Sequence, residues 1–138
     1  KHTVPRLDWR FEVIDHIEIP EADQLADMVC FFSVMTHLLH EQSYWYLEEA
    51  RRVLKPGGKI LFSFLEFHDA RHWPIFRDMI AGAKGKTHTH LNVFMDGSWF
   101  ESWASSLQMV LEDVHGGTDE IVSDGFLGQA LCVLRKPE

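Results

Sequence analysis

The sequence is poor in cysteine, in long apolar runs and in positive charge. Its 138 residues include two cysteines. No apolar stretch approaches the roughly 20 residues of a membrane span, and no apolar run follows the N-terminus as it does in a signal peptide. Thirteen Lys and Arg residues against 21 Asp and Glu residues give a formal net charge of −8. Nucleic-acid binding needs a basic stripe, so we expect neither a nucleic-acid partner nor a membrane partner.

The composition is that of an ordinary globular domain. Hydrophobic residues make up 46% and charged residues 25% of the chain, which argues against disorder and low complexity. The length predicts a single domain over residues 1–138. Cys30 and Cys132 both lie in apolar runs, so we expect two small core residues with no disulfide, as in a cytoplasmic protein.

Short apolar runs alternate with helix-like stretches, which predicts an α/β fold. Residues 28–32 form a continuous apolar run of the kind that is buried on both faces of a parallel sheet. A helical pattern and a second apolar run follow, so residues 28–65 predict a right-handed βαβ crossover. The basic residues that close this helix are expected to be solvated charges: Arg51, Arg52 and Lys55. The predicted strands are 9–14, 28–32, 60–65, 109–114 and 130–134, and the predicted helices are 36–54, 72–83 and 96–107.

Two segments carry a family resemblance. Residues 26–38 read A-D-M-V-C-F-F-S-V-M-T-H-L, and residues 46–63 read Y-L-E-E-A-R-R-V-L-K-P-G-G-K-I-L-F-S. They resemble the fourth and fifth strands, with the intervening helix and turn, of class I S-adenosylmethionine-dependent methyltransferases. The last two predicted strands have no helix between them and are expected to be antiparallel. The resemblance implies a partial Rossmann-like three-layer α/β sandwich, with parallel strands and a C-terminal antiparallel pair.

The chain departs from the family at the cofactor loop. The family has a Gly-rich loop after its first strand, and no G-x-G-x-G occurs in this sequence. We therefore expect the C-terminal part of a methyltransferase domain, without the Gly-rich first βα unit. Such a part would expose the flank of the strand at residues 28–33. That edge would pair with a separate N-terminal half or with a second copy in a homodimer.

The resemblance implies S-adenosylmethionine as the cofactor and places several residues around it. Asp15 matches the residue that accepts a hydrogen bond from the adenine amino group, and His16 would flank the ring. Ser33 would offer its backbone carbonyl to the methionyl ammonium, with Val34 and Met35 lining the site. The plainer alternatives are an ordinary turn for Asp15 and a strand end with core neighbours for the other three.

Histidines supply the candidates on the acceptor side. His37 follows the strand where many family members carry a histidine, and it would orient a small-molecule acceptor or act as a base. Local capping or packing is the alternative. His88 and His90 lie in the stretch that covers the acceptor pocket in the family, and they are further substrate-side candidates.

Two other interpretations stay open. A non-catalytic half-domain would bind or dimerise through the strand edge. A metal-dependent hydrolase would use His68 and His72, but this spacing is not a known ligand signature and no third ligand is evident, so we expect no metal. The aromatic residues of the C-terminal half either line an acceptor pocket or form core: Trp73, Phe76, Phe94, Trp99, Phe100 and Trp103.

Overall fold

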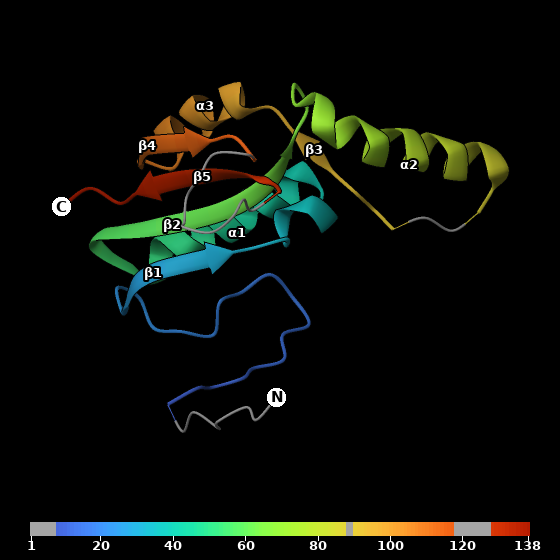
Figure 1. The fold of residues 1–138 in the computed structure, drawn as a ribbon. Helices are drawn as coiled ribbons and strands as arrows, with labels where there is room; N and C mark the ends of the chain where they lie inside the picture. The colour runs from blue at the N-terminus through green and yellow to red at the C-terminus, as the bar shows by residue number, and fades with distance from the viewer. Residues whose placement is uncertain (1–7, 88–89, 118–127) are drawn as a thin grey trace.

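The computed structural model describes residues 8–87, 90–117 and 128–138. Its sheet has the strand order β1-β2-β5-β4 (Figure 1). These strands are β1 (Ala26–Phe31), β2 (Leu54–Glu66), β4 (Val110–His115) and β5 (Ala130–Arg135). β1 and β2 are parallel, whereas β5 is antiparallel to both β2 and β4. A two-residue strand, β3 (Phe94–Met95), pairs in parallel with the end of β2. The predicted partial Rossmann-like α/β fold, with its crossover and closing antiparallel pair, is confirmed.

One face of the sheet is covered by two helices. Helix α1 (His40–Val53) makes the crossover and buries Leu47 and Ala50, and α3 (Phe100–Ser106) buries Phe100. Tyr44 of α1 contacts Trp103 of α3 with ring centroids 5.6 Å apart, so the two helices lie side by side. The described residues thus supply the sheet and one helical layer, and they contain no helix for the third layer of the expected sandwich.

The core forms where alternate side chains of the strands, which point to the same face of the sheet, pack against these helices. Ile60, Phe62 and Phe64 alternate along β2 and are fully buried, as expected for one face of a strand. The Phe100 ring stands edge-on to Phe62 and Phe64, with centroids 5.0 and 4.8 Å apart. Aromatic pairs prefer this T-shaped arrangement. The contact fixes α3 over the middle of the sheet.

Helix α2 (Trp73–Gly85) extends away from the sheet (Figure 1). It follows a short 3-10 turn at residues 70–72, whose N-cap Asp69 accepts a hydrogen bond from the Arg71 backbone N–H. The Trp73 ring contacts Phe67, with centroids 5.6 Å apart. Phe76 contacts Phe67 and Phe94. The helix is therefore attached to the body through aromatic contacts at its first turns.

The L-K-P-G-G segment starts β2 instead of extending the helix. α1 ends at Val53 and the strand begins at Leu54. The register steps from Ala26↔Leu54 to Met28↔Lys59, so residues 55–58 bulge opposite one residue of β1. Gly57 has a φ of +77°, which favours glycine.

Two sequence predictions about the N-terminal side of the sheet are wrong. Residues 9–14 form no strand, and Phe11 and Val13 are exposed, because no neighbouring strand within the described residues offers them hydrogen bonds. Strand β1 is an edge strand and not a strand buried on both faces: Met28 is 54% exposed and Cys30 is also exposed. Cys132, by contrast, is buried as predicted.

Candidate functional site

A polar cluster joins three strands at the carboxyl ends of β1 and β2. The Ser33 backbone N–H donates to Ser63 Oγ at 2.8 Å, and Ser63 Oγ donates to Gln129 Oε1 at 2.7 Å. Gln129 Nε2 closes the ring on Ser33 Oγ at 3.2 Å. Ligands of open α/β sheets bind at such strand ends, so this cluster marks the candidate site.

The cluster holds Ser33 in an unusual conformation. Its φ is +56°, which a residue with a Cβ adopts at a cost of about 1 kcal/mol or more. Ser63 is almost fully buried and supports this turn from the neighbouring strand. Sequence reasoning singled out Ser33 and missed Ser63 and Gln129. The available signal was a hydroxyl inside an otherwise apolar strand, because a buried polar group needs a partner.

The next two predicted residues differ in exposure. Val34 is partly exposed at the end of β1, whereas the Met35 side chain is fully buried in the hydrophobic core. A cofactor beside Ser33 would therefore reach the side chain of Val34 but not that of Met35.

Asp15 and His16 lie in the exposed loop that precedes β1. His16 Nδ1 contacts Asp15 Oδ1 and its Nε2 contacts Glu18 Oε2, both at 2.6 Å. The hydrogen bond to Asp15 raises the pKa of His16, with a further contribution from Glu18. The same bond lowers the pKa of Asp15. This loop lies on the free-edge side of β1 (Figure 1), and the carboxylate of Asp15 is open to solvent.

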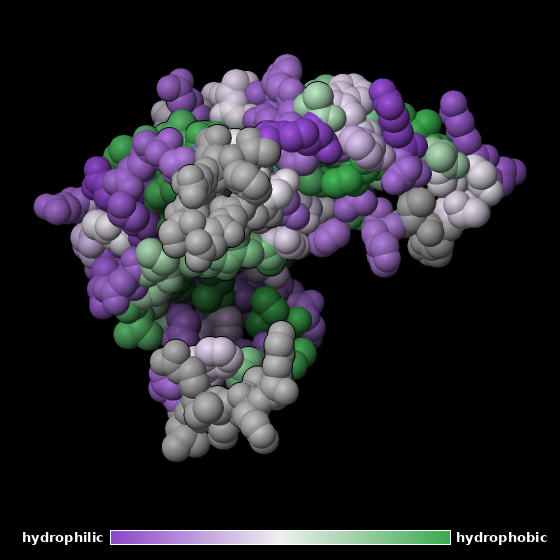
Figure 2. Space-filling view, in the orientation of Figure 1, coloured by the Kyte–Doolittle hydropathy of each residue, from purple (hydrophilic) through white to green (hydrophobic). Residues whose placement is uncertain are grey.

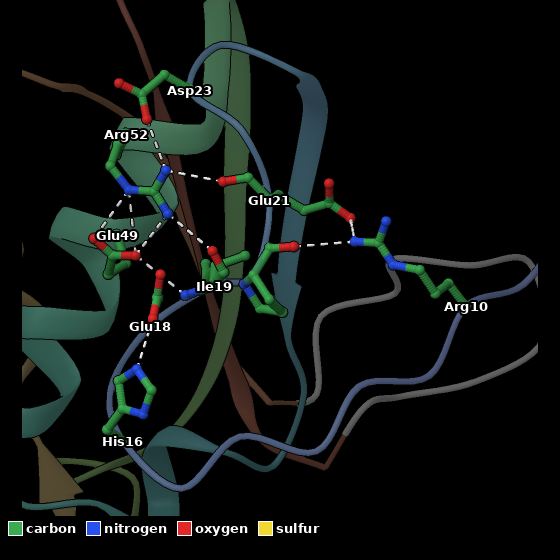
Figure 3. Close-up of polar contacts among 9 residues, drawn as sticks. Arg10, His16, Glu18, Ile19, Glu21, Asp23, Glu49 and Arg52 are labelled. Atoms are coloured by element: carbon green, nitrogen blue, oxygen red, sulfur yellow. Dashed lines mark hydrogen bonds and ion pairs between the residues drawn. The ribbon is translucent and has the colours of Figure 1, made fainter.

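Arg52 fastens this loop to the end of α1 (Figure 3). Its guanidinium donates to the backbone carbonyls of Ile19 and Glu21 and to the carboxylates of Asp23 and Glu49, at 2.7–3.3 Å. These bonds, first that to Glu49, raise its pKa. The expectation that Arg52 is merely a solvated charge is therefore wrong. Its contact with a loop about 30 residues upstream leaves no local pattern in the sequence.

His37 and His40 contact β3 and the segment that precedes it. His37 Nδ1 lies 2.7 Å from the Leu91 carbonyl oxygen, and His40 Nε2 lies 2.8 Å from that of Phe94. A carbonyl only accepts, so these nitrogens carry the protons. Between them, the Val93 N–H donates to the Thr36 carbonyl. His37 is exposed, and its Nε2 is left as an acceptor, as a general base requires.

An apolar pocket of about 320 Å³ opens next to the contact between His40 and Phe94. The Phe67 ring, at the end of β2, and Trp99 form walls, and both are partly exposed. Of the predicted aromatic cluster, Phe94 and Trp99 line the pocket, whereas Phe100 is core. The full lining is His40, Phe67, Phe94, Met95, Asp96 and Trp99. Sequence reasoning missed His40 and Phe67, which come from elements distant in the chain.

The other histidines that the structure describes do not form a common site with one another. His68 pairs with Asp96 at 3.0 Å on the surface. His72 is buried, with Nδ1 and Nε2 facing the carbonyls of Glu66 and Gly128 at 3.2 and 3.0 Å. His90 is exposed, and His88 lies outside the described residues. Over residues 8–87, 90–117 and 128–138, no group of three or more His, Cys, Asp or Glu side chains is placed to hold a metal ion.

The same ranges contain no helix that is long and apolar enough to cross a membrane.

Comparison with known proteins relates the sequence and the fold of this chain to one class of enzyme. Residues 1–62, fewer than half of the chain, match the family model described as a methyltransferase domain. The α/β fold agrees with that class. This chain resembles the class I S-adenosylmethionine-dependent methyltransferases in sequence and in fold, over part of their length.

Three solved structures illustrate the likeness in fold. An S-adenosylmethionine-dependent methyltransferase from Methanosarcina mazei superposes with a TM-score of 0.68 at 12% identity, over 92% of this chain and 66% of that one. A complex between the Haloferax volcanii Trm112 methyltransferase activator and a methyltransferase gives 0.68 at 16% identity, over 98% and 65%. A Thermotoga maritima methyltransferase, described as a possible histamine N-methyltransferase, gives 0.59 at 14%, over 88% and 60%. The chain thus spans less than two thirds of each of these proteins.

Proposed function

We propose that this chain is the C-terminal part of a methyltransferase domain, and that it takes part in methyl transfer from S-adenosylmethionine to a small-molecule acceptor. The observation that carries the proposal is the Ser33–Ser63–Gln129 cluster at the carboxyl ends of two parallel strands. The match of residues 1–62 to a methyltransferase family model supports it independently.

The residues near this strand end fit the cofactor chemically. The exposed Asp15 carboxylate suits the exocyclic amino group of adenine, and His16 would flank the ring. The Ser33 carbonyl suits the methionyl ammonium, with Val34 beside it. The buried Met35 would act by packing under the site. The residues that would hold the ribose hydroxyls and the carboxylate are not provided by this set.

When bound, the sulfonium of the cofactor supplies an already activated methyl group, so the protein needs mainly to orient and to exclude water. His37 would act from Nε2, which its Nδ1–H···O=C bond to Leu91 leaves free. It would accept the proton that the acceptor loses. His90 and His88 remain proposed contacts of the acceptor.

Isothermal titration with S-adenosylhomocysteine tests the proposal on the whole chain. We expect weak, saturable binding with a Kd near the millimolar range, because the donor set is incomplete. Asp15→Ala should weaken it by about 1–3 kcal/mol, the value of a charge-assisted hydrogen bond. Asp8→Ala, in another exposed carboxylate near the N-terminus, is the control. Absence of heat at several millimolar ligand would contradict the proposal.

The free edge of β1 supports a second candidate, a binding or dimerising half-domain. Met28 and Phe32 are about half exposed there, and Figure 2 shows apolar surface along this side of the molecule. An exposed apolar edge invites pairing. One structural neighbour is part of a complex with an activator protein, and protein partnering fits this edge. Sedimentation tests pairing of two copies through this edge. A wild-type dimer that Met28→Lys converts to a monomer would support it. A wild-type monomer would contradict it.

A further inference from the structure

The pocket beside β3 has the chemistry of an aromatic-ring site. Its walls are the rings of Phe67, Phe94 and Trp99, and its floor is the fully buried Met95. A volume near 320 Å³ falls at the lower end of ligand pockets, which run from about 300 to 1,000 Å³. This size suits a ligand of one or two fused rings.

Two of the wall rings are exposed although they are large and apolar. Trp99 is 39% and Phe67 40% exposed. Each is held by other contacts: Trp99 stands edge-on to His40 at 5.0 Å, and Phe67 packs on Trp73. Both rings are thus held in place with apolar surface facing the solvent. A planar ligand would bury that surface and would gain stacking contacts.

Two polar groups restrict the ligand further. The Nε2–H of His40 is used by the Phe94 carbonyl, and in the described part of the chain its Nδ1 has no hydrogen-bond partner. A ligand O–H or N–H would provide one. Asp96 accepts from the Ser98 N–H at 2.9 Å and pairs with His68. The bond to Ser98 lowers the pKa of Asp96, so its negative charge disfavours anionic ligands.

The pocket is connected by hydrogen bonds to the turn that follows β1, which carries the acceptor-side candidate His37. Val93, which precedes β3, bonds to Thr36, and His37 bonds to Leu91. Residues 91–95 therefore run from the end of β1 to the pocket wall. A ring held in the pocket would lie beside the segment that is bonded to Thr36 and His37.

On this geometry, we propose that the pocket binds the ring of a neutral or cationic aromatic alcohol or amine, which is the class of acceptor for the methyl transfer. This assignment rests on the proposed function, but binding of the ring requires only the pocket.

Ligand-observed NMR with 2-naphthol on the whole chain is the test. We expect saturable binding, about tenfold weaker binding of 2-naphthoate because of Asp96, and weaker binding of 2-methoxynaphthalene because it has no donor. Trp99→Ala should weaken 2-naphthol about tenfold. Trp45→Ala removes another exposed tryptophan, which lies outside the pocket, and should leave Kd unchanged. His40→Lys keeps a donor for the Phe94 carbonyl but offers no acceptor, and it should remove the preference for 2-naphthol over its methyl ether.

The contradicting results are specific. Equal effects of Trp99→Ala and Trp45→Ala, or equal affinity for 2-naphthol and 2-naphthoate, would overturn the assignment, provided that circular dichroism shows both variants folded. Titration with S-adenosylhomocysteine separates this failure from that of the proposed function. Ring binding without cofactor binding leaves the pocket standing, and cofactor binding without ring binding overturns only the acceptor class.

Discussion

The Ser63 hydroxyl of β2 accepts a hydrogen bond from the Ser33 backbone N–H at 2.8 Å, across the parallel pair β1–β2. Through this bond, β2 supports the turn that follows β1, in which Ser33 has a left-handed backbone conformation. The candidate cofactor site therefore depends on a buried side chain of the adjacent strand.

Ser63→Ala should destabilise the fold by about 1–3 kcal/mol. The change removes the buried hydroxyl that is the partner of the Ser33 N–H and of Gln129 Oε1, and unsatisfied polar groups carry a cost of this size. Urea unfolding measures the change. Ser105→Ala, at an exposed serine on α3, is the control, and equal effects of the two substitutions would show that the cluster contributes no stability.

Gly58→Ala should destabilise by about 1–3 kcal/mol, since small-to-large changes in packed sites cost this much. A Cβ at Gly58 would lie 2.9 Å from the Lys55 carbonyl oxygen and 3.1 Å from that of Asp27. Neither backbone atom moves easily within the β2 bulge. In Gly85→Ala the new Cβ meets only Thr87 atoms at 3.9 Å or more. Similar thermal midpoints for the two variants would contradict this account of the L-K-P-G-G segment.

Arg52→Lys should loosen the loop that carries Asp15 and His16. Lysine keeps the charge but cannot form the planar fork that reaches two carbonyls and two carboxylates. Losing these bonds should cost about 2 kcal/mol. It should also speed proteolysis between residues 15 and 25. Arg77→Lys, exposed on α2, should leave the cleavage rate unchanged. Equal rates for wild type and Arg52→Lys would contradict the role of Arg52.

His16 should titrate above its ordinary value of 6.5, because its bonds to Asp15 and Glu18 raise its pKa. A raised pKa in the folded state means that this contact favours folding fully below pH 6.5, and that the contribution is lost as pH rises through the raised value. Proton NMR of the imidazole resonances measures it. Asp15→Asn should bring the pKa back toward 6.5, and an unchanged pKa in that variant would show that the contact is not formed.

The sequence was sufficient to predict the crossover from β1 to β2 and the antiparallel pair of β4 and β5. Periodicity and the L-K-P-G-G segment located the helix between β1 and β2, because these signals are local. The exposure of β1 was predicted only from the family resemblance. The apolar run 28–32 by itself indicated burial, since a run of this kind does not reveal whether a neighbouring strand is present.

The site was harder to predict because its contacts join distant segments. Ser63 and Gln129 are 66 residues apart, and His40 and Phe94 are 54 apart. No spacing rule covers such pairs. The sequence left open whether Trp99 lines a pocket or belongs to the core. It lies just before α3, and its ring lines the pocket.

In the proposed function, the carboxyl ends of β1 and β2 form a cofactor face together with the loop before β1. Amide chemical shifts of the ¹⁵N-labelled chain, recorded during titration with S-adenosylhomocysteine, locate the bound ligand. We expect Asp15, His16, Ser33 and Val34 to shift together with one Kd. Shifts that are absent, or that fall only on β4 and α2, would contradict it.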